Sequence, residues 1–244
     1  MEVESQRDSN PDLKESIEIG REGQEEHPNR WPDKFDAQGQ KFKEVMQDFF
    51  LQCKEMHRLL MSALALGMGL SETFFDDFVV QGDNTLRLLH YPPVKKSVFK
   101  KNKGQVRAGV HTDYGSVTFL FQDLRGGLQV QGPSGEWLDV QPIEGSCVVN
   151  AGDLLARWSN DQVKSTLHRV VEPPFKTKEK EKVLNEDDSE QEYPARYSIA
   201  YFCNPDFDKW IEALPGTWEK KKGGKQYEGV NSGNYLLKRL SVTH

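Results

Sequence analysis

The chain lacks the features that mark membrane or secreted proteins. Its 244 residues contain no apolar run close to the ~20 residues of a membrane-spanning helix. The acidic, hydrophilic amino terminus does not have the pattern of a signal peptide. Three cysteines, Cys53, Cys147 and Cys203, are odd in number and have no CxxC spacing, which favours reduced thiols. We therefore predict a cytoplasmic protein.

The chain also lacks an excess of positive charge. Its formal net charge is −6, and the lysines lie in solvated clusters without interleaved aromatic residues. We expect neither a nucleic-acid partner nor a membrane partner. The hydrophobic fraction of 36% and the 20 glycines are ordinary for a globular protein with polar tails. The length suffices for a buried core in one large or two small domains.

The first 83 residues are expected to precede the catalytic core. Residues 1–35 are rich in Glu, Asp, Gln, Asn and Pro, which favours a flexible or loosely docked polar lead-in. Residues 36–83 are expected to form a helical buttress. Apolar residues recur there at spacings of three and four, which predicts a long amphipathic helix over 36–66 that two glycines end. A short second helix, capped by its first residue, is expected over 71–78.

From residue 84 the pattern changes to short β-rich runs separated by turn signals at intervals of about 8–12 residues, which is typical of an all-β sandwich or barrel. We expect strands at 85–91, 106–111, 116–121, 128–131, 137–140, 146–150, 154–158, 165–171 and 196–203. A long helix ahead of these strands predicts a mainly β fold, a jelly-roll barrel over 84–205 buttressed by helices. Such a barrel has a mouth where inward-facing residues converge.

Three further segments are expected to lie outside the barrel strands. Residues 95–104 form a basic run, interpreted as a solvated loop. Residues 176–192 are a charged insertion of low complexity, interpreted as an exposed loop. The C-terminal segment, 206–244, is expected to carry a small helix over 235–240 that covers a sheet or a pocket mouth.

A His-x-Asp pair ends one of the predicted strands. Side chains alternate along a strand, so His111 and Asp113 project to the same face, close enough to hold one ion. An imidazole nitrogen and a carboxylate oxygen suit Fe(II), Mn(II) or Zn(II). His168, in a later β-rich run, is the best candidate for a third ligand, which would complete the facial triad of non-haem iron oxygenases. A zinc hydrolase is less favoured, because no general-base Glu stands near these residues.

The last predicted strand carries two polar groups among apolar neighbours. Arg196 and Ser198 lie two apart and share a face with Phe202. An arginine is costly to bury unless it meets an anion. A guanidinium beside a hydroxyl makes a good carboxylate clamp. An arginine that faces solvent on an edge strand would explain the same residues.

The first predicted strand presents a parallel case. Arg87, Leu89 and Tyr91 share one face, so if Tyr91 points inward Arg87 does as well. His90 then points the other way, and we do not expect it to bind the metal.

Seven motifs occur together in a fixed order. They are Leu86-x5-Pro92, His111-Thr112-Asp113, Gly127-Leu128-Gln129-Val130, Gly135-Glu136-Trp137, Asn150-Ala151-Gly152-Asp153, Ser165-x2-His168-Arg169-Val170 and Arg196-x-Ser198. In this order they resemble the isopenicillin-N-synthase-like branch of the Fe(II)/2-oxoglutarate-dependent oxygenases, from about residue 29 to residue 240. The chain is most similar to microbial and fungal members of that branch.

The resemblance implies a double-stranded β-helix with iron held by the His-x-Asp pair and His168. It implies that Arg196 and Ser198 bind the far carboxylate of 2-oxoglutarate, that Tyr91 hydrogen-bonds it, and hence that the arginine faces inward. Phe202 matches an aromatic residue that stacks on substrate in flavonoid-oxidising relatives. We add Arg87 as a partner for a carboxylate or hydroxyl of the substrate.

The activity implied is hydroxylation or desaturation of a small organic substrate by O2, with succinate and CO2 as co-products and ascorbate as a candidate reductant. Two alternatives stay open. Isopenicillin N synthase and the ethylene-forming amino-acid oxidase share the Arg-x-Ser motif without consuming 2-oxoglutarate, so an iron-dependent oxidase is one. A non-catalytic β-barrel fragment is the other.

Two departures from the family's pattern lead to further expectations. Family members usually carry a further segment before the part that matches residue 29, and this chain begins inside that region. We therefore expect an uncovered sheet edge and exposed apolar surface, over which a partner or a second copy could associate. Leu89 stands where plant relatives often have Asn near the 2-oxoglutarate site, which predicts a different cosubstrate affinity.

Overall fold

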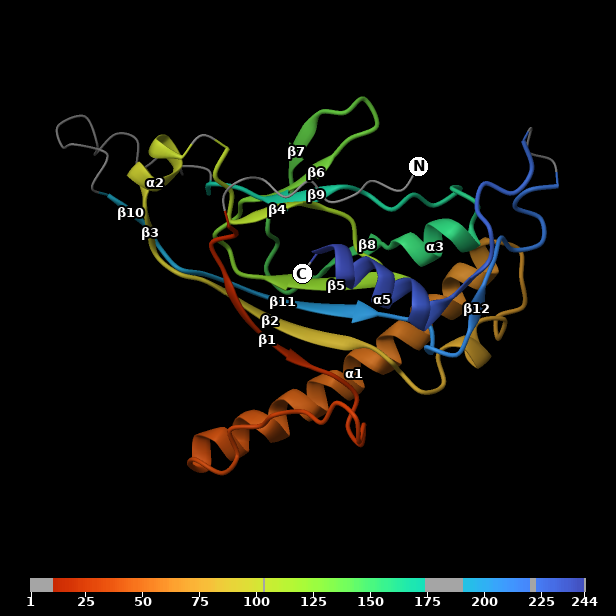
Figure 1. Ribbon diagram of the computed structural model, residues 1–244, viewed down its shortest axis with the longest axis horizontal. Helices are drawn as coiled ribbons and strands as arrows, with labels where there is room; N and C mark the ends of the chain where they lie inside the picture. Colours follow the sequence, from red (N-terminus) through yellow and green to blue (C-terminus); the bar gives the residue numbers. More distant parts are fainter. Residues whose placement is uncertain (1–10, 103, 174–190, 220–222, 244) are drawn as a thin grey trace.

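Two antiparallel sheets face each other in a computed structural model that describes residues 11–102, 104–173, 191–219 and 223–243 (Figure 1). The larger sheet has the strand order β1 (Glu15–Ile19), β2 (Thr85–Tyr91), β11 (Arg196–Cys203), β5 (Val117–Gln122) and β8 (Val148–Ala151). The smaller has the order β4 (Ala108–His111), β9 (His168–Val170), β6 (Leu128–Gln131) and β7 (Trp137–Asp139). This arrangement confirms the predicted double-stranded β-helix.

Shorter elements complete the chain. They are helices α2 (Lys96–Lys101), α3 (Asp153–Trp158) and α5 (Ser232–Thr243), a 3-10 turn η1 (Asp76–Phe78), and the paired strands β3 (Val94–Lys95) with β10 (Glu192–Tyr193) and β12 (Trp210–Ile211) with β13 (Val230–Asn231). The predicted C-terminal helix is therefore present and longer than expected. The charged insertion lies, up to residue 190, outside the described residues.

The long helix α1 (Ala37–Gly67) covers the outer face of the larger sheet, while the smaller sheet lies on the other side (Figure 1). Asp36 caps it, because its side chain accepts a hydrogen bond of 2.7 Å from the amide of Gly39. Phe50 packs edge-on against Tyr201 of β11, with ring centres 5.1 Å apart. The helix ends where Gly69 adopts a φ of +74°. The predicted buttress is confirmed.

Alternation along β11 separates two cores. Tyr201 and Cys203 face α1 and belong to the larger hydrophobic core. Ala200, next to Tyr201 in the strand, faces the smaller sheet and packs in a second cluster with Leu128 and Val170. Because the period of a strand is two, Arg196 and Ser198 lie on the same inner face as Ala200. The space between the sheets therefore receives the polar residues singled out in the sequence.

The structure corrects the polar lead-in. β1 is hydrogen-bonded to β2 in a ladder of five residue pairs, and Ile19 is buried against the core of α1. The open edge of β2 supplies backbone partners that composition alone does not reveal. The edge strands of the larger sheet are β1 and β8. Exposed apolar surface is present on α1, where Leu51, Leu59 and Leu66 are each more than half exposed.

Three other segments differ from expectation. Residues 71–78 form turns and η1 rather than a full helix, and the Ser71 hydroxyl pairs with the Thr73 hydroxyl instead of capping. The basic run after residue 95 contains α2. Residues 154–158 belong to α3 instead of a strand. Four of these five residues are buried, and a short apolar run of this kind has no period that separates helix from strand.

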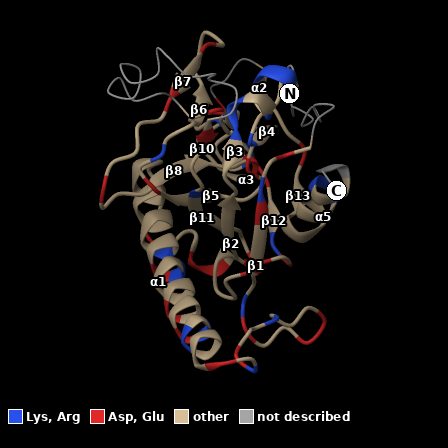
Figure 2. Cartoon of the chain, turned by 90° about the vertical axis from the view of Figure 1, so that its left-hand side faces the viewer, with Lys and Arg blue, Asp and Glu red and all other residues tan. Residues whose placement is uncertain are grey.

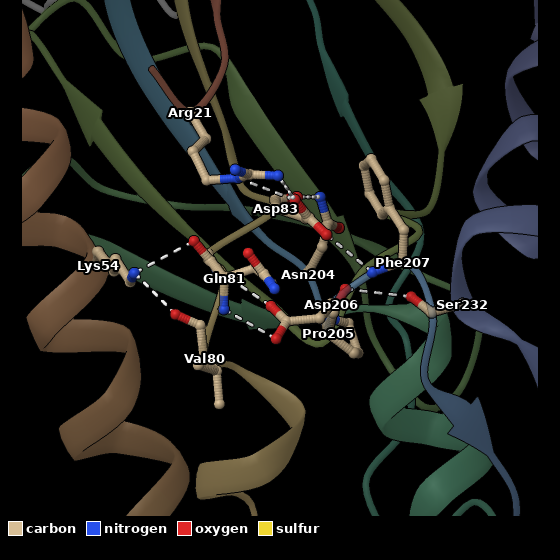
Figure 3. A network of polar contacts seen from close by, with 11 residues as sticks. Arg21, Lys54, Val80, Gln81, Asp83, Asn204, Pro205, Asp206, Phe207 and Ser232 are labelled. Carbon is tan, nitrogen blue, oxygen red and sulfur yellow. Dashed lines mark hydrogen bonds and ion pairs between the residues drawn. The ribbon is translucent and has the colours of Figure 1, made fainter. Parts of the chain in front are cut away.

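A polar network fixes the loop that follows β1 (Figure 3). Arg21 donates to the buried carboxylate of Asp83 at 3.1 and 3.2 Å. Asp206 accepts two backbone amides from the loop before β2 at 2.8 and 3.0 Å, and burial raises its pKa. Lys54 of α1 donates to two carbonyls of that loop, and Ser232 at the start of α5 donates to a carbonyl beside Asp206. The network holds one end of β1 against the barrel.

Surface charge is mixed in sign. Figure 2 shows segments coloured for acidic and for basic residues along α1 and its flanking loops. Within the described ranges, no helix is long and apolar enough to cross a bilayer. The predicted cytoplasmic location stays a prediction.

Candidate active site

The three predicted metal ligands meet at one end of the smaller sheet. His111 ends β4 and His168 begins β9, and these two residues are register partners in the antiparallel ladder. Asp113 follows two residues after the end of β4 at the same place, with its Oδ1 atom 3.7 Å from Nε2 of His168. One ligand atom from each residue can be chosen so that all three lie within 4.8 Å of one another. That spacing is compatible with one metal ion bound between them.

Backbone carbonyls orient both imidazoles. Nδ1 of His111 lies 2.7 Å from the Gly109 carbonyl, and Nδ1 of His168 lies 3.1 Å from the Thr166 carbonyl. A carbonyl only accepts, so each Nδ1 carries the proton and each Nε2 keeps its lone pair for a metal. Asn150 donates to Oδ2 of Asp113 at 2.7 Å, which fixes the carboxylate. Asn150 lay in a family motif, but the sequence did not predict this role.

Electrostatics match a divalent cation. Burial, followed by the neighbouring His168, lowers the pKa of His111 to about 4, so this imidazole is neutral at physiological pH. Burial alone would raise the pKa of Asp113, but the two histidines and the Asn150 hydrogen bond outweigh it and hold the pKa below its usual value. A neutral nitrogen ligand and an ionised carboxylate are thus ready in a buried site. These donors suit Fe(II) and similar ions.

The turn that carries Asp113 is braced from behind by α3 and α5. The amide of Asp153 donates to the Asp113 carbonyl at 2.8 Å. The Asp153 carboxylate accepts from the hydroxyls of Tyr235 at 3.0 Å and Thr112 at 3.3 Å. Arg239 of α5 donates to Thr112 at 3.3 Å. The sequence placed a helix at the C-terminal end but did not predict that it contacts the metal-binding turn.

The predicted carboxylate clamp faces the interior. Arg196 is 1% exposed and lies on a strand between β2 and β5, which excludes the edge-strand alternative. Its guanidinium donates to Ser198 Oγ at 3.2 Å, to the Gly126 carbonyl at 3.1 Å and to Gln122 Oε1 at 3.1 Å. Tyr91 lies beneath it, with its ring centre 4.9 Å from the guanidinium carbon. The sequence did not predict the contacts with Gln122 and Gly126.

Arg87 and Phe202 line the same cavity. The guanidinium carbon of Arg87 lies 4.9 Å from the ring centre of Phe202. Its Nε donates to Glu18 of β1 at 2.7 Å, a partner that the sequence did not predict. His90 points away from the cavity, as expected, pairing with Glu15 and stacking on a tyrosine.

One cavity joins all these groups. Its lining includes the three metal ligands, the clamp residues Arg196, Ser198 and Tyr91, and the pair Arg87 and Phe202, with apolar walls from Leu89, Leu120, Leu128, Val130, Val148 and Val170. A buried cation and hydroxyl beside a metal triad are compatible with a carboxylate-bearing cosubstrate that also chelates the metal. The donor set and the clamp fit Fe(II) and 2-oxoglutarate.

Comparison with known proteins agrees with this geometry. The model of the 2OG-Fe(II) oxygenase superfamily matches residues 82–205. The chain belongs to this superfamily. This result confirms the family prediction, and the match spans both sheets of the oxygenase core except β1.

Fungal relatives match nearly the whole chain. The 2-oxoglutarate-Fe(II) type oxidoreductase ppzD of Metarhizium rileyi is 36% identical over 96% of this chain and 62% of its own length. The proline hydroxylase buaE of Petromyces alliaceus is 35% identical over 96% of this chain and 69% of its own length. This oxygenase chain thus spans only about two thirds of the length of these relatives.

A solved structure is more similar. A full-length protein of Neurospora crassa, crystallised in complex with alpha-KG and thymine, shares 56% identity and superposes with a TM-score of 0.87. The match covers 97% of this chain and 67% of the Neurospora protein. The similarity therefore extends through α1 and β1 as well as the barrel.

Proposed function

We propose that this oxygenase is an Fe(II)- and 2-oxoglutarate-dependent dioxygenase that hydroxylates or desaturates a small organic molecule. The observation that carries the proposal is the single cavity in which a buried Arg196–Ser198 pair faces the His111, Asp113 and His168 cluster. When bound there, iron and 2-oxoglutarate supply the activation of O2, with succinate and CO2 as co-products.

The chain's own residues provide binding and orientation. The two imidazoles and the carboxylate would hold the metal, and three protein ligands would leave it able to bind the cosubstrate. Arg196 and Ser198 donate to the far carboxylate of the cosubstrate in a site screened from water, where such bonds are strong. Tyr91 is buried with its ring against the guanidinium, and we assign its hydroxyl as a further donor to the same carboxylate.

We infer further that the substrate is a pyrimidine base of the thymine type. The Neurospora protein has been solved with thymine and with 5-formyluracil, at 56% identity to this chain in each case. The cavity supports this inference, because Phe202 offers a ring face to a planar compound and Arg87 offers N–H donors to a ring carbonyl.

The proposal is tested by anaerobic titration with Fe(II) and then 2-oxoglutarate, followed by succinate release with thymine. Bidentate chelation should produce a visible metal-to-ligand charge-transfer band, which His111→Ala abolishes and Arg196→Ala weakens. Thymine should then stimulate succinate formation. Iron binding without the band or succinate would instead support the oxidase that does not use 2-oxoglutarate.

A non-catalytic fragment is distinguished by thermal unfolding. A protein that binds the metal in its native state gains stability with metal concentration. We expect one cooperative transition that Fe(II) or Mn(II) raises, and no such rise in His111→Ala. A metal-independent transition in both proteins would contradict a functional metal site.

A further inference from the structure

A short segment ahead of β1 closes one side of the barrel. We call residues 11–14 the N-terminal strap. The β1 ladder begins with Glu15 opposite His90 on the larger sheet. The strap then reaches the smaller sheet, where Asp12 Oδ1 accepts from the Gly109 amide at 2.9 Å and the Pro11 carbonyl accepts from Gln105 at 3.0 Å. Figure 1 shows this part of the trace rising from β1 towards β4.

The strap places one side chain in the cavity. Lys14 lines it together with His111, Arg87 and Phe202. Lys14 is thus a cation on the wall of the metal-bearing cavity, supplied by a segment far in sequence from the Arg196 clamp.

Lys14 and Arg87 each pair with a carboxylate that lies outside the cavity lining. Lys14 Nζ is 2.8 Å from Asp12, and Arg87 is bound by Glu18, but neither carboxylate lines the cavity. Among the described lining residues, Asp113 is the only carboxylate, and it belongs to the metal cluster. The part of the cavity wall formed by Lys14 and Arg87 therefore offers hydrogen-bond donors from two cations.

We propose that Lys14 is a specificity-determining residue whose ammonium group donates a hydrogen bond to an acceptor oxygen of the substrate. This inference rests on the proposed function and refines it: the preferred ring carries carbonyl or carboxylate oxygens towards Lys14 and Arg87. A ring with an amino group at that edge places donor against donor, which leaves both groups unpaired. Thymine, with two ring carbonyls, fits this wall better than 5-methylcytosine, in which an amino group replaces one of them.

Lys14 is suitable for mutation because the strap has anchors that do not involve its side chain. The hydrogen bonds of Asp12 to Gly109 and of Gln105 to Pro11 remain in Lys14→Met, which preserves side-chain length and removes the charge. The Lys14–Asp12 ion pair is partly exposed, with side-chain exposures of 26% and 36%, and such pairs contribute little to stability. Lys43→Met is a matched control, because Lys43 also pairs with an aspartate at similar exposure, 31% and 25%, but does not line the cavity.

The experiment measures thymine binding by calorimetry to the protein loaded anaerobically with Fe(II) and 2-oxoglutarate. Hydrogen bonds to charged groups predict a Kd for thymine raised about tenfold or more in Lys14→Met. Lys14→Arg should retain most of the affinity, and Lys43→Met all of it. The charge-transfer band and the Kd for 2-oxoglutarate should stay unchanged, and the preference for thymine over 5-methylcytosine should fall in Lys14→Met.

Three results would overturn the assignment, each in its own way. Unchanged thymine affinity in Lys14→Met would remove Lys14 from substrate binding and leave the proposed function standing. Loss of both 2-oxoglutarate and thymine binding would indicate a displaced strap and so a structural role. If the wild-type protein binds 2-oxoglutarate but neither thymine nor 5-formyluracil, the pyrimidine substrate is wrong, and the role of Lys14 is rejected with it.

Discussion

Replacing Arg196 with Met should weaken the binding of 2-oxoglutarate strongly but change the folding stability of the unliganded protein little. Arg196 is 1% exposed, and no carboxylate pairs with it among the described residues, so its charge is buried without an anion. In the free protein this charge is a cost that its hydrogen bonds to Ser198, Gln122 and Gly126 offset. In the proposed complex, the carboxylate of 2-oxoglutarate would neutralise it. The arginine therefore contributes mainly to the liganded state.

The expected magnitudes follow from these contacts. Two charge-assisted hydrogen bonds to the cosubstrate are lost in Arg196→Met, at about 1.5–3 kcal/mol each. The Kd for 2-oxoglutarate should then rise by about 10²-fold or more. The free energy of unfolding of the unliganded protein should change by less than about 1.5 kcal/mol, because the lost hydrogen bonds and the removed buried charge oppose each other.

The affinity is measured by anaerobic titration of the charge-transfer band, and the stability by urea unfolding of the metal-free protein. Arg58→Met on the surface of α1 is the control, since Arg58 forms an exposed pair with Glu55, and it should alter neither quantity. A Kd for Arg196→Met within about threefold of wild type would refute the clamp. A loss of more than about 3 kcal/mol in the unliganded protein would refute the argument from an uncompensated charge.

Three further changes test other parts of the site. Gly152→Ala should lower the free energy of unfolding, measured in urea, by about 1–3 kcal/mol, because an added Cβ would lie 2.3 Å from the Gly115 carbonyl oxygen. Gly67→Ala is the control: its added Cβ meets nothing within 4 Å, so the variant should be neutral or stabilising. Asn150→Ala should weaken Mn(II) binding about 10–100-fold, measured by calorimetry, because the carboxylate ligand loses the hydrogen bond that orients it; unchanged affinity would show that the bond is dispensable. Burial lowers the pKa of His57 to about 3, so the unfolded chain binds more protons below about pH 6.5 and stability falls with falling pH. Between about pH 6.5 and 5 wild type should lose about 1.6 kcal/mol more than His57→Gln in urea unfolding, and equal losses would contradict this assignment.

The sequence predicted the barrel where residues alternate and turns are marked. β2 and β11 have the predicted bounds, because each strand lies between clear turn signals and carries a period of two. α3 was mistaken for a strand, since Leu154, Leu155, Ala156 and Trp158 are all buried and no face stays polar. Periodicity is informative only where one side of an element meets water.

The positions of the proposed metal ligands and of the proposed carboxylate clamp were predictable for a local reason. His111 and Asp113 stand two residues apart beside a strand, as do Arg196 and Ser198 on theirs, so alternation alone places each pair on one face. The residues that orient them come from distant segments. Asn150 and Gln122, for instance, reach the site only through the pairing of strands, which the sequence around either residue does not encode.

The lead-in shows how a pairing partner turns an ambiguous pattern into a definite one. Ile17 and Ile19 are two apart, and Ile19 is buried in the core beneath α1. Once β1 is paired with the free edge of β2, these two residues show which face of β1 points towards α1. Glu18 then has the opposite parity and faces the barrel side of the sheet, where it pairs with Arg87. Lys14 lies one residue before the ladder and lines the cavity. A charged, polar stretch that composition assigns to solvent thus supplies one side chain, Lys14, to the wall of the cavity, and the role proposed for Lys14 follows from that position.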